Sequence, residues 1–126
     1  MADINKEAFV ELQNKLVETS SKLKQVQMQI RSKEVEKKRA ILTLEELKGL
    51  PETNTYKSVG KAFILEPQEN LIKEYEGRSK ECESTLGTLQ TSLEYLERQM
   101  REVENNLKEL LHQTPGLAQQ VMALTV

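Results

Sequence analysis

Two heptad repeats, separated by a short segment rich in β-forming residues, limit this chain to very few folds. In a heptad labelled a to g, apolar residues at positions a and d form the seam along which helices pack in a coiled coil. Residues 9–47 carry mostly apolar residues at these positions, and the repeat in residues 72–110 is cleaner. The a positions are Phe9, Leu16, Leu23, Ile30, Lys37, Leu44, Ile72, Ser79, Leu86, Leu93, Met100 and Leu107, and the d positions are Leu12, Thr19, Val26, Lys33, Ala40, Leu47, Tyr75, Cys82, Leu89, Leu96, Val103 and Leu110. Two long helices are the prediction.

The two repeats have matching registers for antiparallel packing. When two helices run antiparallel, a layers of one meet d layers of the other, so the residue numbers of each pair have a constant sum. This relation places the midpoint of the fold between Val59 and Gly60, inside the segment that separates the repeats. The pairs that satisfy it are Phe9 with Leu110, Leu16 with Val103, Leu23 with Leu96 and Ile30 with Leu89.

The segment between the repeats, TNTYKSVGKAFILE at residues 53–66, has the composition of a β-hairpin. Gly60 tolerates a positive φ angle, and we expect a type II turn over residues 58–61 with Gly60 at its third position. The strand-forming residues around it are Tyr56, Val59, Phe63, Ile64 and Leu65.

We therefore predict a mainly helical fold, in which two long helices form an antiparallel coiled coil joined by a central β-hairpin. A second helix-start signal, Thr43 followed by Glu46 at capping-box spacing, suggests that the first helix ends near Leu42. The predicted single domain at 1–126 consists of a first helix at 5–42, a short helix and connector at 43–54, the hairpin at 55–66, a second helix at 67–113 and an apolar tail at 114–126.

Composition argues against several classes of protein. Charged residues make up 30% of the chain and aromatic residues 4%, which suits exposed helices better than a large packed core. The net charge of -2 gives no electrostatic reason to expect nucleic acid or a membrane as the main partner. The start of the chain lacks a secretory signal pattern, and no apolar run approaches the ~20 residues that span a bilayer. We expect a cytoplasmic protein, and a nuclear location stays open.

Catalytic and cofactor chemistry find little support in the sequence. His112 is the only histidine and Cys82 the only cysteine, and Cys82 occupies a seam position where a small core residue is expected. The chain has no CxxC or HExxH metal pattern and no glycine-rich phosphate-binding loop. We expect no enzyme activity, no metal and no cofactor.

A local basic run at residues 31–39 allows two interpretations. It contains Arg31, Lys33, Lys37, Lys38 and Arg39 against two glutamates. A nucleic-acid contact is conceivable, but charge runs on helices more often form a solvated or partner-facing surface. The second interpretation is the one we adopt.

The hairpin predicts assembly with other chains. A two-stranded sheet is marginal in water, and its unpaired edges need further strands. We expect several copies or relatives of this chain to join through their hairpins.

The order of long helix, TNTYKSVGKAFIL and long helix resembles the β-class subunits of the prefoldin family, over nearly the whole chain. The resemblance implies a hetero-hexamer of two α-class and four β-class subunits, whose hairpins form a β-barrel platform. It also implies that the complex captures unfolded polypeptides such as actin and tubulin and passes them to the cytosolic group II chaperonin without ATP hydrolysis. Carried over by position, the assembly hairpin comprises Tyr56, Val59, Gly60, Phe63, Ile64 and Leu65.

The family places client binding at the tips of the coiled coils, where the start of the first helix meets the end of the second. Apolar residues at such an end are incompletely covered, which suits weak contacts with many sequences. The alternative is a structural coiled-coil dimer or an adaptor protein, although a simple dimer would not need the hairpin. The client-binding residues we expect at the tip are Ile4, Phe9, Val10, Leu107, Leu110, Leu111, Leu117, Val121, Met122 and Leu124.

Overall fold

The chain folds into two helices joined by one antiparallel hairpin. The structure, a computed structural model, describes the backbone of residues 2–114 and 116, and the side chains of the same residues from 6 onward. Its elements in chain order are α1 (Ala2–Gly49), β1 (Thr55–Val59), β2 (Ala62–Glu66) and α2 (Gln68–Gln113). No helix of this described part is both long and apolar enough to cross a membrane.

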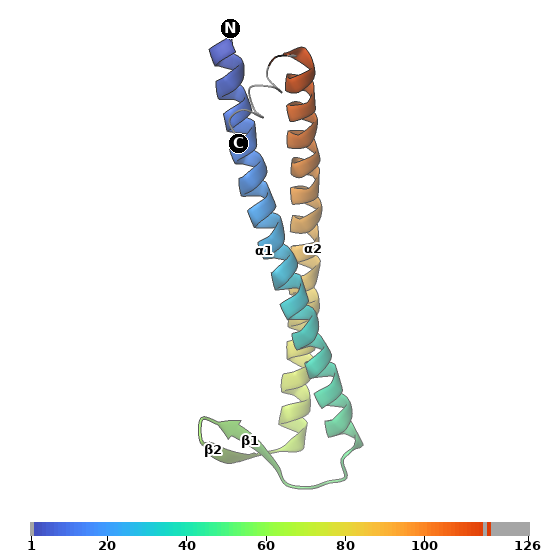
Figure 1. The fold of residues 1–126 in the computed structure, drawn as a ribbon. Helices are drawn as coiled ribbons and strands as arrows, with labels where there is room; N and C mark the ends of the chain where they lie inside the picture. Colours follow the sequence, from blue (N-terminus) through green and yellow to red (C-terminus); the bar gives the residue numbers. More distant parts are fainter. Residues whose placement is uncertain (1, 115, 117–126) are drawn as a thin grey trace. The chain divides into compact units, whose positions relative to one another are not determined.

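The described residues divide into two compact units, and both helices contribute to each unit. Among the described residues, unit 1 combines the start of α1, up to Gln27, with the end of α2, from Thr91 onward. Unit 2 is continuous, Met28–Gln90, and contains the hairpin. Within each unit α1 and α2 run antiparallel (Figure 1).

The predicted seam is the core of both units. Every a and d position from Phe9 to Leu110 is buried or half-buried, whereas most other helical positions are exposed. In unit 1 a shallow groove is lined by residues of α1 between Leu12 and Lys22 and of α2 between Gln99 and Asn106, as antiparallel pairing requires. The most deeply buried apolar residues are Ala40, Leu47, Leu71, Cys82, Leu96 and Val103.

Two lysines occupy seam positions in unit 2. Lys33 and Lys37 are both half-buried, so their aliphatic stems cover neighbouring apolar side chains. The ammonium group of Lys33 lies 3.1 Å from the carboxylate of Glu36, and this hydrogen bond raises the pKa of Lys33. At Lys33 the seam thus tolerates a lysine because the charge reaches the carboxylate of Glu36.

The first helix is longer than predicted at both ends. It begins at Ala2 rather than near Asn5, since no proline or glycine precedes that residue to stop it. It also continues past Leu42 to Gly49, so the predicted separate helix after Thr43 is wrong. Leu47 is only 9% exposed because the seam continues through it, and this packing outweighs the local capping signal.

The second helix begins at Gln68, one residue after the predicted start, and ends at Gln113 as predicted. Pro67 precedes it, and the Pro67 carbonyl accepts backbone hydrogen bonds from Asn70 and Leu71, at 3.0 and 3.3 Å. Only this proline separates β2 from α2, whereas residues 50–54 separate α1 from β1. These unequal connectors shift the centre of the hairpin from the predicted midpoint to between Gly60 and Lys61.

The hairpin turn differs from the predicted type. Val59 pairs with Ala62, so Gly60 and Lys61 form a two-residue loop and Gly60 is its first residue rather than the third residue of a type II turn. The φ angle of Gly60 is 61°, while no described residue other than glycine has a positive φ. This combination fits a type II′ turn, whose twist matches the twist of the paired strands, whereas a type II turn would splay them.

Substituting Gly60 tests this turn. No atom lies within 4 Å of a Cβ added at Gly60, so Gly60→Ala changes only the backbone energy. The left-handed conformation should cost alanine about 1–2 kcal/mol, and Gly60→Asn should recover part of this loss. Hydrogen exchange of the amides in residues 55–66 measures the effect.

Gly77 provides a control for the same substitution in a helix. A Cβ there also meets nothing within 4 Å, but Gly77→Ala should stabilise α2 by about 1 kcal/mol. Equal effects of Gly60→Ala and Gly77→Ala on amide exchange would contradict the turn assignment.

Candidate functional sites

The hairpin presents one face that is almost entirely apolar. Cross-strand partners share a face, and the register pairs Tyr56 with Leu65 and Ser58 with Phe63. The side chains of Tyr56, Phe63 and Leu65 are 59%, 75% and 58% exposed. We call these four residues the outer face of the hairpin. Within the part of the chain that the structure describes, all four side chains are exposed.

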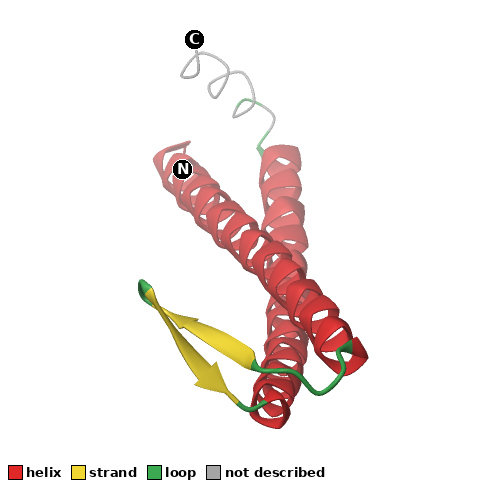
Figure 2. Cartoon of the chain, turned by 90° about the horizontal axis from the view of Figure 1, so that it is seen from below, coloured by secondary structure: helices red, strands yellow, loops and turns green. Residues whose placement is uncertain are grey.

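The opposite face of the hairpin is only partly covered. Its residues include Lys57, which contacts α2, and Val59 and Ile64, which are each still 50% exposed. Exposure on both faces leaves a sheet that lacks a second layer, as seen where the strands project beside the helix ends of unit 2 (Figure 2).

Both strands also have an unpaired edge. Among the described residues the sheet consists of β1 and β2 alone. The backbone N–H and C=O groups along the outer edge of each strand are therefore available to another strand. An apolar face and two open edges are the requirements for a sheet that is completed by other chains.

An ion-pair cluster connects the hairpin to α2. The Lys57 ammonium lies 2.9 Å from a carboxylate oxygen of Glu74, and the Arg78 guanidinium lies 2.9 Å from the same oxygen. The hydrogen bond from Lys57, followed by the charges of Lys57 and Arg78, lowers the pKa of Glu74. Arg78 also lies over the ring of Tyr75, 4.9 Å from its centroid. Through Lys57 this cluster links β1 to α2.

A second polar contact joins the helix ends beside the hairpin. The Gln68 side-chain amide donates to the Leu47 carbonyl at 2.6 Å and, at 3.4 Å, to the Leu50 carbonyl. Leu47 lies in the last turn of α1 and Leu50 directly follows the helix, where carbonyls lack i+4 helical partners. The Lys48 ammonium and Glu76 carboxylate also approach within 3.5 Å. Gln68 thus caps α1 from the first residue of α2.

Sequence reasoning missed Lys57, Gln68, Glu74 and Arg78. Arg78 contacts Glu74 one turn away on the same helix, α2. Lys57 with Glu74, and Gln68 with the Leu47 carbonyl, are contacts between different elements. No local pattern marks such pairs, because they depend on the angle between the hairpin and the helices. Only the spacing of Glu74 and Arg78 was a readable signal.

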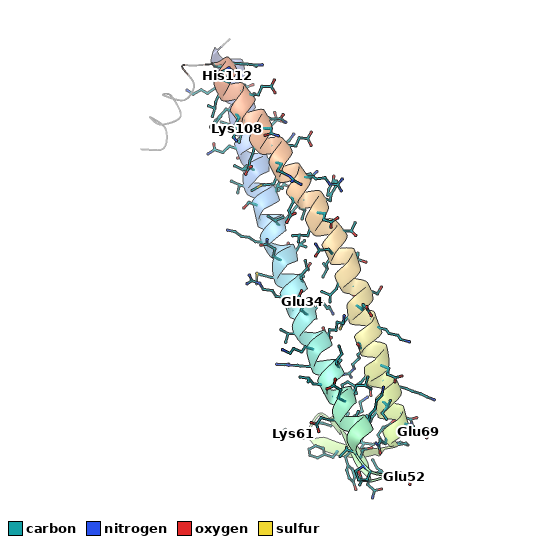
Figure 3. All side chains as sticks on the ribbon, turned by 90° about the vertical axis from the view of Figure 1, so that its right-hand side faces the viewer. Glu34, Glu52, Lys61, Glu69, Lys108 and His112 are labelled. Carbon is teal, nitrogen blue, oxygen red and sulfur yellow. The ribbon has the colours of Figure 1, made fainter. Side chains whose placement is uncertain are left out.

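The predicted tip residues have different environments at the end of unit 1. Phe9, Leu107, Leu110 and Leu111 are half-buried, and Val10 is 48% exposed. The start of α1 and the end of α2, which is marked by Lys108 and His112, lie at this same end of the unit (Figures 1 and 3). The remaining predicted tip side chains lie outside the described residues: Ile4, Leu117, Val121, Met122 and Leu124.

The described residues offer no arrangement for metal or nucleophilic chemistry. They contain no group of three or more histidine, cysteine or acidic side chains that could hold a metal ion. Cys82 is 3% exposed within the seam, and His112 is an exposed residue of the last turn of α2. The surfaces that stand out are the hairpin and the helix faces.

Comparisons with known proteins agree on one family. A family model described as "Prefoldin subunit" matches residues 10–114. Prefoldin subunit 1 of Arabidopsis thaliana is 56% identical over 128 residues, covering 100% of both chains. The human prefoldin subunit 1 is 38% identical over 86 residues, which are 68% of this chain and 70% of the human one.

A solved structure shares the fold. The crystal structure of the prefoldin beta subunit from Thermococcus strain KS-1 matches with a TM-score of 0.51 at 25% identity, covering 84% of this chain and 88% of that chain. The chain therefore shares the fold of that prefoldin beta subunit.

The Glu74 cluster makes a prediction about stability and pH. Glu74→Gln removes the carboxylate that both Lys57 and Arg78 contact, which should lower the free energy of unfolding by about 0.5–1 kcal/mol at pH 7, because the groups are partly exposed. Since the folded pKa of Glu74 is lowered, its contribution is present above the unfolded pKa and is lost as pH falls through the folded pKa. Urea unfolding at pH 7 and at pH 3 measures the difference.

Glu83→Gln is the matched control, because Glu83 is an exposed α2 residue outside the ion pairs of the described chain. It should change stability little at either pH. A Glu74→Gln effect that is the same at both pH values would show that the carboxylate charge is not the cause.

Proposed function

The chain belongs to the prefoldin family, and from this premise we propose that it helps the prefoldin complex to capture unfolded polypeptides and to deliver them to the cytosolic group II chaperonin. As a prefoldin subunit it is a non-enzymatic co-chaperone that assembles with other prefoldin subunits. Its clients in our proposal are unfolded actin and tubulin chains, held without ATP hydrolysis. We place this activity in the cytoplasm and leave a nuclear location open.

One observation carries the proposal: the outer face of the hairpin is exposed on a sheet that has two open edges. Phe63, at 75% exposed, is its most exposed large apolar side chain. Monomeric proteins rarely leave such a sheet uncovered. Assembly with other subunits through the hairpins would cover the apolar face and pair the edges, leaving the helices free for clients.

We place client capture at the end of unit 1. Half-buried and exposed apolar residues gather at the end of unit 1, including Phe9 and Val10 of α1 and Leu110 of α2. Individual contacts of this kind are weak. Several subunits binding one unfolded chain together would gain affinity through avidity.

Assembly through the hairpin is tested by placing a charge on its outer face. Phe63→Asp should leave the isolated chain folded, since Phe63 is exposed, but should prevent formation of a six-chain complex because an unpaired carboxylate would be buried at the joint. Native mass spectrometry after co-expression with the other prefoldin subunits gives the composition. Val17→Asp, at a residue 65% exposed on α1, is the matched control and should assemble normally.

The composition measured by native mass spectrometry also decides between a prefoldin subunit and a structural coiled-coil dimer. A homodimer formed equally by the wild type and by Phe63→Asp would favour the structural coiled-coil alternative over the prefoldin complex. Normal six-chain assembly of Phe63→Asp would remove the outer face from the assembly interface.

Client binding by the tail is tested by truncation after Gln113. The truncated chain should still assemble, because the hairpin is intact, but should suppress the aggregation of denatured actin several-fold less well. Light scattering measures suppression. A full-length chain with serine at Leu117, Val121, Met122 and Leu124 keeps the tail length and should behave like the truncation. Unchanged suppression by both variants would exclude the tail from client binding.

A further inference from the structure

The outward face of α1 in unit 2 carries large apolar side chains at a single heptad position. Met28, Val35 and Leu42 are 70%, 53% and 52% exposed. They are spaced by one heptad at position f, which lies on the side of the helix away from the seam. We call these three residues the outer stripe. At ~1.5 Å per residue it extends about 21 Å along the helix.

The other helix of the same unit has no such stripe. The f positions of α2 in unit 2 are Asn70, Gly77 and Ser84, and all three are exposed. Single apolar residues on a surface are normal. Three apolar residues in a row at the f position of α1, where α2 has polar or small residues, give α1 a second apolar face in addition to the seam.

The outer stripe is flanked by positive charge. Arg31 and Lys38 occupy the b positions on one side and Arg39 a c position on the other, and all three are exposed. No acidic residue occupies a b, c or f position between Met28 and Leu42. Within the described residues none of these three cations takes part in an ion pair. The basic run noted in the sequence thus flanks the stripe between Met28 and Leu42, beyond which the exposed Glu45 and Glu46 occupy the next b and c positions.

We propose that the outer stripe docks an acidic amphipathic helical segment of another polypeptide. Apolar residues of that segment, spaced at i, i+3/i+4 and i+7, would cover Met28, Val35 and Leu42. Its flanking Asp and Glu residues would pair with Arg31, Lys38 and Arg39. This site uses neither the outer face of the hairpin nor the end of unit 1, so it is separate from the proposed assembly and client-binding surfaces.

Two other occupants fit these observations less well. A second copy packing stripe to stripe would bring its own Arg31, Lys38 and Arg39 against the same cations, and like charges oppose that contact. A single-stranded nucleic acid would place phosphates beside apolar side chains, and the stripe has no aromatic residue on which bases could stack. The sign of the charge and the apolar spacing both favour an acidic helix.

Binding of a synthetic peptide tests the proposal directly. The probe is a fluorescein-labelled helical peptide of about 21 residues, about 30 Å long, with leucines on one face and glutamates on either side of them. It is titrated by fluorescence anisotropy with the full chain assembled with the other prefoldin subunits. The triple variant Met28→Gln, Val35→Gln, Leu42→Gln should weaken binding at least tenfold, since each covered apolar side chain is worth roughly a factor of ten.

Charge reversal tests the electrostatic half of the site. The double variant Arg31→Glu, Lys38→Glu should also weaken binding at least tenfold, and raising the salt concentration should weaken binding to the wild type. The matched control is the double variant Lys73→Glu, Lys80→Glu, at two exposed b positions of α2 in the same unit. It changes the net charge of the chain by the same amount. This control should bind as the wild type does. Circular dichroism checks that every variant remains helical.

Further controls identify the occupant. A peptide of the same composition with its leucines spread around the helix, and a peptide with lysine in place of glutamate, should both bind at least tenfold more weakly. Equal binding of the scrambled peptide, or equal loss in the α2 control, would overturn the proposal. So would failure of the assembled complex to bind the probe, which would mean that a neighbouring subunit covers the stripe. Displacement by single-stranded RNA with no effect of the glutamine triple variant would identify a nucleic-acid surface instead.

Discussion

The heptad seam between α1 and α2 is the constraint on which the rest of the structure depends. A two-helix seam can cover each side chain from one direction only, so most a and d residues are half-buried and few, such as Cys82 and Val103, are fully enclosed. A core this thin has no room for an enclosed site with converging polar groups. Among the residues that the structure describes, the surfaces available for function are helix faces, helix ends and the hairpin, which agrees with a co-chaperone.

Polar contacts connect the hairpin to the helices of unit 2, while no second layer of side chains covers it in the described part of the chain. Lys57 pairs with Glu74, and Gln68 caps the end of α1. The same arrangement leaves Tyr56, Phe63 and Leu65 exposed. A chain that orients a sheet without covering it is prepared for contact with other subunits, because little further ordering is needed when they bind.

Much of the fold could be predicted because the seam and the strands are periodic and local. The predicted a and d positions are all buried or half-buried, although the deeply buried Leu71 lies outside them, and Gly60 was correctly placed in the turn. Its position within the turn was wrong because the unequal connectors, which leave no heptad signal, shift the hairpin by one residue. The end of α1 was wrong because the capping signal at Thr43 is local, whereas the burial of Leu47 depends on the opposite helix.

The candidate sites were less predictable, since they depend on which surfaces remain uncovered. Tyr56 and Phe63 could be assigned to a hairpin from sequence, but their common face required the register. The outer stripe, in contrast, can be located from the sequence once the seam is known. Once the seam fixes the a and d positions, each f position is expected to face water, and an apolar residue there is informative only through its repetition. Met28, Val35 and Leu42 repeat while the f positions of α2 do not, so the asymmetry between two helices of one coiled coil separates a binding face from ordinary surface composition.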